Sequence, residues 1–264
     1  MVGKLLSLFK STPTEPPKAG PQLAMPLFPK SEPLDFSAIP AVWAALYPDK
    51  PALKHQRADG KVDTFTSGDQ EVAAVHIPMP VPKAVEIIRT SWMWQQPDDV
   101  IQAHRSHAIV TAMPSGKPVA DATLVACFCA AALKAFSGVA LYWGSGRQML
   151  PPAVVEAMTT ELEGPPVMLW IGLTISGDSK TGPFSATTHG LEALGHKEFE
   201  VRGTRMGIGE LRGNLYRFAS YVLESGPVLK HGQTIGPDAN THWKVSHEPS
   251  KLVPGRDVIV LGIP

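Results

Sequence analysis

The 264-residue sequence contains only two cysteines, Cys127 and Cys129, and both lie in one apolar segment. Side chains two residues apart on a helix point in different directions, so these thiols can neither form a disulfide easily nor share a metal ion. We expect both to be buried and reduced, which suits a reducing compartment. The start of the sequence also lacks a secretory signal, because the apolar run before Lys10 is short and no small-residue cleavage site follows. We therefore expect a cytoplasmic protein.

The sequence has no excess of charge of either sign. Lys and Arg number 24, as do Asp and Glu, so the formal net charge is zero. Nucleic-acid-binding proteins usually carry a basic excess, and we expect no nucleic-acid partner. A membrane span needs about 18 or more apolar residues. The nearest stretch, Val119 to Phe136, is interrupted by Asp121, Thr123 and Lys134, so we expect no transmembrane segment.

Catalytic and metal-binding motifs are equally scarce. The segment from Gly172 to Ser179 has the glycine spacing of a phosphate loop, but Asp178 stands where lysine is needed and would repel phosphate. His104 and His107 have a spacing that suits a metal, yet the expected helix ends between them, which favours hydrogen-bonded structural histidines. The turn at 143–146 could hold an anion on its backbone N–H groups, although a plain turn is the simpler interpretation. We expect no metal ion and no cofactor, and no catalytic residue can be named.

Proline is concentrated at the N-terminus, where residues 1–51 contain ten of the 26 prolines. Because proline fixes φ and removes a backbone donor, this density argues against long helices and central strands. We expect residues 1–51 to form a flexible tail with short ordered segments. The ordered segments would be one or two amphipathic turns at 4–10 and a short helix at 36–46 that packs on the rest of the protein. A flexible spacer at about 11–22 would separate them.

From about residue 70 onward, strands and helices alternate. The expected strands cover residues 71–79, 107–113, 139–143, 167–175, 184–189, 197–202, 242–247 and 257–262, and the expected helices cover 82–94, 98–105, 118–136, 151–162 and 210–224. This order predicts an α+β fold, with a mixed, largely antiparallel sheet or sheets and helices packed on one face. We expect residues 70–264 to form a single domain that could be divided near residue 165. The apolar strand at 167–175 is expected to be central, and the helix at 118–136 to be buried on most sides.

Aromatic residues make up only 7% of the chain, so the tryptophans near one another in sequence are candidates for binding. Trp92 and Trp94 cannot both face one core from a helix, and an exposed tryptophan often anchors an interface. Trp143 is a third candidate, although packing in the core is the simpler interpretation for all three.

The start of the tail is a second candidate for binding. It could act as a tethered recognition peptide that uses Leu5, Leu6, Leu8 and Phe9. A terminus without a role in binding is the alternative.

The most informative run extends from Thr188 to Glu200. In the expected strand Glu198 and Glu200 share one face, with His189 and His196 in the preceding loop. Two carboxylates on one face could act as general acid and base or bind a cation. A solvated strand face is the simpler interpretation.

This run and four further segments together resemble the bacterial domain family DUF4261, over roughly residues 70–264. The further segments are AHRSHA at 103–108, residues 139–143, PVMLW at 166–170 and VLKHGQTIG at 228–236. The pattern Thr-x-Gly-Leu followed by Gly-x-x-Glu-x-Glu is also similar to a motif of suppressor-of-fused-type domains, which in bacteria are often immunity or interaction modules. The resemblance implies a bacterial cytoplasmic protein, sometimes associated with toxin or secretion loci, and it implies no catalytic residues.

Two hypotheses follow. The first is a non-enzymatic protein-binding module of a bacterial toxin or secretion system, such as type VI secretion. Its partner would be another protein, and it would act as an immunity protein, an adaptor or a chaperone for an effector. The second is a hydrolase or metal-dependent enzyme that uses Glu198, Glu200 and His189. The oligomeric state is left open by the sequence.

Overall fold

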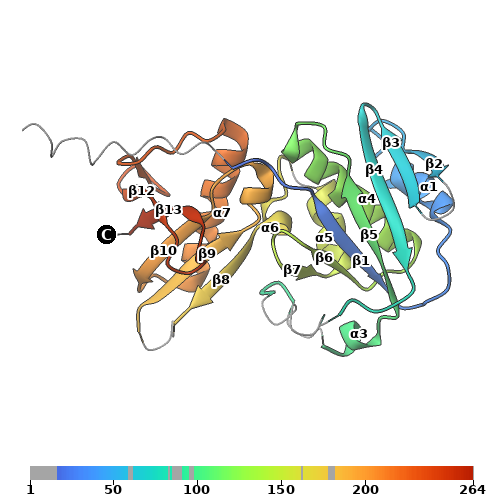
Figure 1. Cartoon of the computed structure of the whole chain (residues 1–264), viewed down its shortest axis with the longest axis horizontal. Helices are drawn as coiled ribbons and strands as arrows, with labels where there is room; N and C mark the ends of the chain where they lie inside the picture. The colour runs from blue at the N-terminus through green and yellow to red at the C-terminus, as the bar shows by residue number, and fades with distance from the viewer. Residues whose placement is uncertain are drawn as a thin grey trace, which may run out of the picture.

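The computed structural model of the protein describes residues 17–58, 62–82, 84, 91–94, 98–161, 163–177 and 182–263. It contains two β-sheets, which lie at the two ends of the long axis of the molecule (Figure 1). We call residues 23–160 the N-terminal unit and residues 172–262 the C-terminal unit. Both sheets are mostly antiparallel and helices pack against them, so the predicted α+β class is confirmed.

The sheet of the N-terminal unit has seven strands in the order β2-β3-β4-β5-β1-β6-β7, and every neighbouring pair is antiparallel. The strands are β1 Leu23–Phe28, β2 Lys54–Ala58, β3 Val62–Ser67, β4 Gln70–Ile77, β5 Ser106–Ala112, β6 Ala140–Trp143 and β7 Gln148–Leu150. Of these, β4, β5 and β6 lie where the sequence predicted strands.

Strand β1 corrects the prediction that the proline-rich N-terminal part contains no central strand. It lies between β5 and β6 and pairs with both. Its register against β5 is the same on either side of Pro26, with Ala24 opposite Val110 and Leu27 opposite His107. Pro26 therefore removes one N–H donor without shifting the ladder. Full burial of the Ala24 and Leu27 side chains outweighs that loss.

The helices of the N-terminal unit surround a nearly all-apolar helix, α4 (Pro118–Ala135). It contacts β1, β5, the short helix α1 (Ile39–Leu46) and α5 (Pro152–Thr160). The 3-10 helix η1 (Phe36–Ala38) leads into α1, so the short helix predicted at 36–46 is present. As predicted, α4 is buried on most sides, and both of its cysteines are buried and free of disulfides. Helix α3 (Asp98–Ala103) follows the prediction, whereas most of the helix predicted at 82–94 lies outside the described residues.

Among the described residues, α4 is also the one helix whose length and composition would suffice to cross a membrane. In this structure 67% of it is buried inside the protein.

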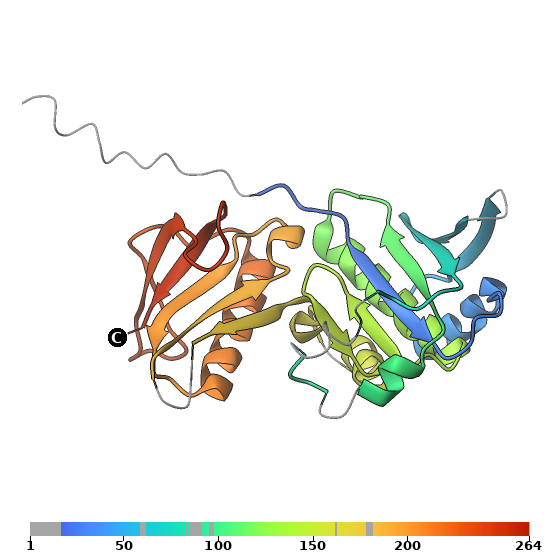
Figure 2. The same ribbon diagram turned by 60° about the horizontal axis from the view of Figure 1, so that its bottom comes forward.

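The C-terminal unit is built on a six-stranded sheet in the order β11-β12-β13-β10-β9-β8, in which only β10 and β13 are parallel. The strands are β8 Gly172–Ser176, β9 Phe184–His189, β10 Phe199–Thr204, β11 Thr234–Ile235, β12 Trp243–Pro249 and β13 Asp257–Gly262. The long helix α7 (Ile208–Ser225) packs on one face of this sheet (Figure 2). It buries an apolar stripe at helical spacing that includes Leu211, Leu215, Phe218 and Val222.

The segment between the two units differs from the prediction of one central strand at 167–175. Val167–Trp170 forms a four-residue helix, α6, and the strand that follows, β8, lies at the edge of its sheet. Pro166 occupies the N-cap position of this short helix. The segment is apolar because it is buried between the two units, with the side chains of Leu169 and Trp170 fully covered. Sequence periodicity alone cannot distinguish a short buried helix from a buried strand.

Three glycines bring the backbones of the two units into direct contact around the Trp170 carbonyl group. A Cβ atom at Gly146, in the turn between β6 and β7, or at Gly190, after β9, would overlap the Trp170 carbonyl oxygen. A Cβ atom at Gly172, at the start of β8, would overlap the Gly146 carbonyl oxygen. Gly190 also has a φ of 117°, which non-glycine residues rarely adopt. Side chains are therefore excluded from all three positions.

Side chains from the N-terminal unit complete this junction. Gln148 of β7 is buried, and its amide Nε2 donates to the carbonyl oxygens of Met168 (3.0 Å) and Leu169 (3.4 Å) at the end of α6. The rings of Trp143 and Trp170 stack with their centroids 6.3 Å apart. The main cluster of buried apolar side chains consequently contains residues of both units.

The chain before β1 also bridges the two units (Figure 2). The Gly20 N–H and the Gln22 side-chain amide both donate to the Ala193 carbonyl oxygen, at 3.1 and 2.7 Å, in the 3-10 helix η2 (Glu192–Leu194). The predicted flexible spacer at about 11–22 therefore needs correction for residues 17–22, which lie along the C-terminal unit. These two hydrogen bonds hold this segment on the C-terminal unit, whereas composition alone favoured a free chain.

Replacing Gly172 with alanine should lower the free energy of unfolding by about 1–3 kcal/mol, since the new methyl group overlaps the Gly146 carbonyl oxygen. Gly213→Ala in α7 is the matched control. A Cβ atom there meets nothing within 4 Å. The helix interior favours alanine over glycine by roughly 0.5–1 kcal/mol. Urea unfolding measures both variants, and a Gly172→Ala variant as stable as the wild type would contradict this packing.

Candidate functional site

The two carboxylates singled out in the sequence, Glu198 and Glu200, are both buried. Glu198 is 4% exposed and Glu200 is fully covered. The interpretation of a solvated strand face is therefore wrong. Burial of a carboxylate is unfavourable unless hydrogen bonds compensate for the lost water, so the partners of each group define its role.

Glu198 holds the loop between β9 and η2. Its carboxylate accepts hydrogen bonds from the Thr188 hydroxyl (2.7 Å), the Gly190 N–H (2.7 Å) and the Glu192 N–H (3.1 Å). Burial raises the pKa of Glu198 above its ordinary value, and the hydrogen bonds from Thr188 and the loop offset only part of this effect.

Glu200 holds a different turn, the one between β12 and β13. It accepts hydrogen bonds from the Ser250 hydroxyl, the Lys251 N–H (3.1 Å) and the Leu252 N–H (3.4 Å), and it pairs with the Arg202 guanidinium at 2.6 Å. Burial alone would raise the pKa of Glu200, but the hydrogen bonds from Ser250, Arg202 and Lys251 hold it below the ordinary value. Arg202 also pairs with Glu248 at 2.5 Å, which fixes the guanidinium beside Glu200.

The two carboxylates therefore share no hydrogen-bond partner and each holds a separate turn. This arrangement differs from an acid and base directed at one reacting atom. Among the described residues, no group of three or more His, Cys, Asp or Glu side chains could hold a metal ion.

His189 lies at the buried end of β9, and one ring nitrogen is 2.8 Å from the Thr174 hydroxyl. Burial lowers the pKa of His189 to about 4, and the positive charges of Arg147 and Arg256 contribute. The ring is therefore neutral near pH 7. His189 and Glu198 both line a cavity of about 330 Å³ at the junction of the two units. His196, the other histidine of the run, does not line this cavity, and burial lowers its pKa as well.

The tryptophan candidates occupy three different environments. Trp143 is fully buried, and its indole N–H donates to the Ser145 hydroxyl at 3.0 Å. Trp92 is 39% exposed, but it is engaged within the chain. It donates to the Tyr216 hydroxyl at 3.0 Å, and the Arg212 guanidinium lies 3.5 Å from its ring centroid. Trp92 thus contacts α7 of the C-terminal unit. Trp94 is half-buried against a smaller apolar cluster of the N-terminal unit.

His104 accepts a hydrogen bond from the Val81 N–H (2.8 Å), and a His107 ring nitrogen lies 2.7 Å from the Met79 carbonyl oxygen, so both are structural histidines. The proposed recognition residues of the tail lie outside the described residues. They are Leu5, Leu6, Leu8 and Phe9.

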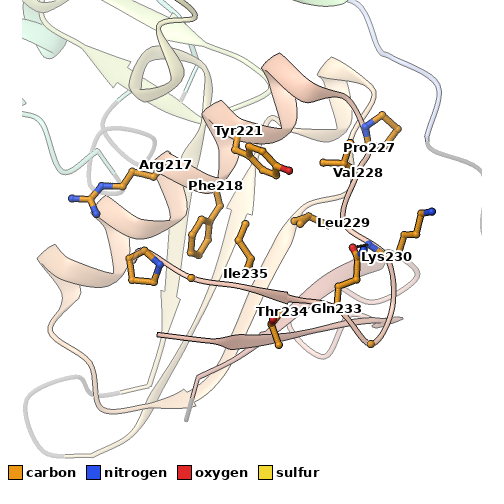
Figure 3. Close-up of a pocket in the computed structure, with 13 residues that line it drawn as sticks. Arg217, Phe218, Tyr221, Pro227, Val228, Leu229, Lys230, Gln233, Thr234 and Ile235 are labelled. Carbon is orange, nitrogen blue, oxygen red and sulfur yellow. Dashed lines mark hydrogen bonds between the residues drawn. The ribbon is translucent and has the colours of Figure 1, made fainter. Parts of the chain in front are cut away.

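The sequence did not predict a second cavity, which lies on the C-terminal unit. It is a groove of about 1140 Å³ between α7 and the segment that leads into β11 (Figure 3). Its lining consists of Arg217, Phe218, Tyr221, Pro227, Val228, Leu229, Lys230, Gly232, Gln233, Thr234, Ile235, Gly236 and Pro237. We call this cavity the α7 groove. Tyr221 is exposed on α7. A large aromatic residue within this otherwise regular amphipathic pattern was the signal in the sequence that could have indicated the groove.

Apolar and cationic groups are arranged differently in the α7 groove. Phe218, Tyr221, Leu229 and Ile235 lie around its centre, while Arg217 and Lys230 extend toward opposite ends in Figure 3. None of the described residues that line the groove is Asp or Glu. The groove therefore combines apolar contact with positive charge.

The geometry defines a two-sheet α+β protein with a surface groove and a separate cavity at the junction of its units. The model of the family described as domain of unknown function DUF4261 matches residues 187–262. The resemblance predicted from the sequence is confirmed over these residues, whereas the similarity to suppressor-of-fused-type domains stays a prediction. Neither a curated protein nor a solved structure matches the chain. The matched residues include the whole lining of the α7 groove.

Glu200→Gln should destabilise the protein at pH 7 by about 2 kcal/mol, because an amide replaces a buried, charge-assisted acceptor. The pKa of Glu200 is lowered in the folded state, so its contribution is complete above its ordinary value of 4.5 and is lost as the pH falls below it. Urea unfolding from pH 7 down to acidic pH should therefore show the difference between the wild type and the variant becoming smaller.

The exposed Glu224→Gln in α7 is the control and should change stability by less than about 0.5 kcal/mol. A Glu200→Gln variant that is as stable as the wild type at pH 7 would show that the carboxylate does not hold the β12–β13 turn.

Proposed function

We propose that this chain is a non-enzymatic protein-binding module, and that the α7 groove receives a segment of its partner. The observation that carries the proposal is the groove itself, which joins an apolar centre to two cations and lies wholly within the matched family region. The carboxylates that could have supported catalysis are occupied in holding two turns. This leaves the alternative of a hydrolase or metal-dependent enzyme with less support.

Charge and shape favour an acidic partner segment that also carries an apolar side chain. Tyr221 is 46% exposed, and a large amphipathic ring of this kind commonly anchors an interface. Arg217 and Lys230 are exposed at the two ends and would pair with carboxylates of the partner. Such exposed pairs should make binding sensitive to ionic strength.

The backbone beside the groove suits an extended peptide. β11 is the outermost strand of its sheet and pairs with β12 alone. An edge strand offers N–H and C=O groups to an added strand, a common mode of peptide recognition. A partner segment could therefore bind through backbone hydrogen bonds and place alternate side chains in the groove.

The first residues of this chain are a weaker candidate for the same groove. Leu5 and Phe9 could supply apolar contact, but Lys4 and Lys10 would meet the cations of the groove. We keep the tail as a separate recognition element, as proposed from the sequence. A chain that lacks residues 1–16 would show whether the tail occupies the α7 groove. If it does, its removal would tighten peptide binding, and if the tail is a separate element, peptide binding would not change.

A narrower role in a bacterial toxin or secretion system is proposed from the family resemblance alone. In that role the protein would be cytoplasmic and act as an immunity protein, an adaptor or an effector chaperone. The gene neighbourhood tests this part, because a gene that stands away from toxin and secretion genes would contradict it. The binding role of the groove would be unaffected by that result.

Tyr221→Ala and Arg217→Glu should each weaken binding of groove-directed peptides by about tenfold or more, which corresponds to about 1.4 kcal/mol. The probes are fluorescent peptides selected on the wild-type chain from a random peptide library, and fluorescence anisotropy measures the dissociation constants. Selected sequences should be rich in Asp or Glu beside an apolar residue.

Matched controls are Ile208→Ala and Arg205→Glu, which change exposed residues outside the groove. These should bind like the wild type. Selection of no peptide, or equal affinity for the wild type and the Tyr221 and Arg217 variants, would contradict the proposal.

A further inference from the structure

The junction cavity of about 330 Å³ is lined by segments that are far apart in the sequence. The residues before β1, the turn between β6 and β7, the region from β9 to β10 and the turn between β12 and β13 all contribute. Its lining consists of Lys18, Gly20, Ser145, Arg147, His189, Gly190, Glu192, Ala193, Glu198 and Arg256. Cavities between units of a protein are preferred places for small ligands, and this volume lies at the lower end of their usual range.

Three cationic side chains and two carboxylates line this cavity. Lys18, Arg147 and Arg256 come from three different segments, so only the folded chain brings them together. The two carboxylates of the lining already have partners. Glu192 pairs with Arg256 at 3.0 Å, and Glu198 accepts the hydrogen bonds of its own loop. Because the Glu192 pair involves Arg256 itself, the net positive charge of the lining comes from three cationic side chains facing two carboxylates.

Ser145 adds a hydroxyl donor to these cations. The indole of Trp143 can only donate, so in their 3.0 Å hydrogen bond the Ser145 oxygen is the acceptor. Its own hydrogen is then available for another acceptor. Trp143, a candidate binding residue from the sequence, would thus act on the cavity indirectly by orienting this hydroxyl.

We propose that the junction cavity binds the phosphate group of a small phosphorylated molecule. Arg147 and Arg256 would provide guanidinium donors, Lys18 a third positive charge and Ser145 a hydroxyl donor. A phosphate group suits this set because its several oxygens can accept hydrogen bonds from guanidinium, ammonium and hydroxyl donors at the same time. The site shares no lining residue with the α7 groove, so it stands independently of the proposed protein partner.

His189 gives this proposal an internal spectroscopic probe. Burial and the charges of Arg147 and Arg256 hold its pKa at about 4. Lys18, Glu192 and Glu198 line the same cavity and complete its charged surroundings. A bound dianion would neutralise part of the positive field, so the pKa of His189 should rise toward its ordinary value of 6.5.

Titration of the full chain with inorganic phosphate and with glycerol 3-phosphate tests the proposal. The histidine resonances followed by NMR spectroscopy should saturate, and the pKa of His189 should increase in the bound form. Tighter binding of glycerol 3-phosphate would identify a phosphate ester as the ligand, while equal or tighter binding of inorganic phosphate would identify the free ion. Either result supports a phosphate site.

Arg147→Gln and Lys18→Gln should each weaken this binding by about tenfold or more, because each removes a charge-assisted contact. Residue 147 has a positive φ of 53°, which glutamine and arginine tolerate equally poorly. The Arg147→Gln variant therefore keeps the backbone strain unchanged. Lys230→Gln, which lies in the α7 groove, is the control and should bind phosphate like the wild type. Absence of saturable binding below about 10 mM, or equal binding by the Arg147 and Lys18 variants, would overturn the proposal.

Discussion

The contact of Gly146, Gly172 and Gly190 around the Trp170 carbonyl group sets how the two sheets meet. With no side chain at these positions, the turn after β6 can approach the start of β8 and the end of β9. The stacked Trp143 and Trp170 rings then fill the space beside this contact. The junction cavity depends on the same approach, because Ser145 and His189 reach it from opposite units.

Buried polar groups stabilise the turns that surround this contact. Gln148 satisfies carbonyl oxygens at the end of α6, and Glu198 satisfies N–H groups of the loop after β9. Glu200 does the same for the turn between β12 and β13, with Arg202 as its counter-charge. Each of these side chains would be costly to bury alone, so they specify one loop conformation rather than merely adding stability. The α7 groove lies on the C-terminal unit, away from these constraints, where a partner can reach it.

The sequence predicted much of this fold but little of the site. The long apolar run at 118–136 placed α4 well and the amphipathic pattern at 210–224 placed α7 well, because long patterns leave few alternatives. β1 was missed because proline statistics describe the lost hydrogen bond and take no account of burial between β5 and β6. The apolar pattern at 167–170 predicts a strand, whereas the residues form α6 because the junction between the units buries them and a sheet does not. Both errors arise from contacts between segments that are distant in the sequence.

The run around Glu198 and Glu200 was recognised as important, but its role depends on the same kind of distant contact. Glu200 bonds to Ser250 and its neighbours, about fifty residues later in the chain, and no local pattern shows this. The α7 groove escaped prediction because α7 and β11 form it only after folding. The family match points to the same C-terminal residues, 187–262, which form β10, α7 and the groove.

We infer that the glycine junction joins the two sheets into one cooperative structure with a shared core. Hydrogen exchange of the full chain, measured by mass spectrometry across a urea titration, tests it most directly. We expect peptides from β5 and from β10 to lose protection at the same urea midpoint. Loss of protection in the C-terminal unit at a clearly lower or higher midpoint than in the N-terminal unit would contradict it.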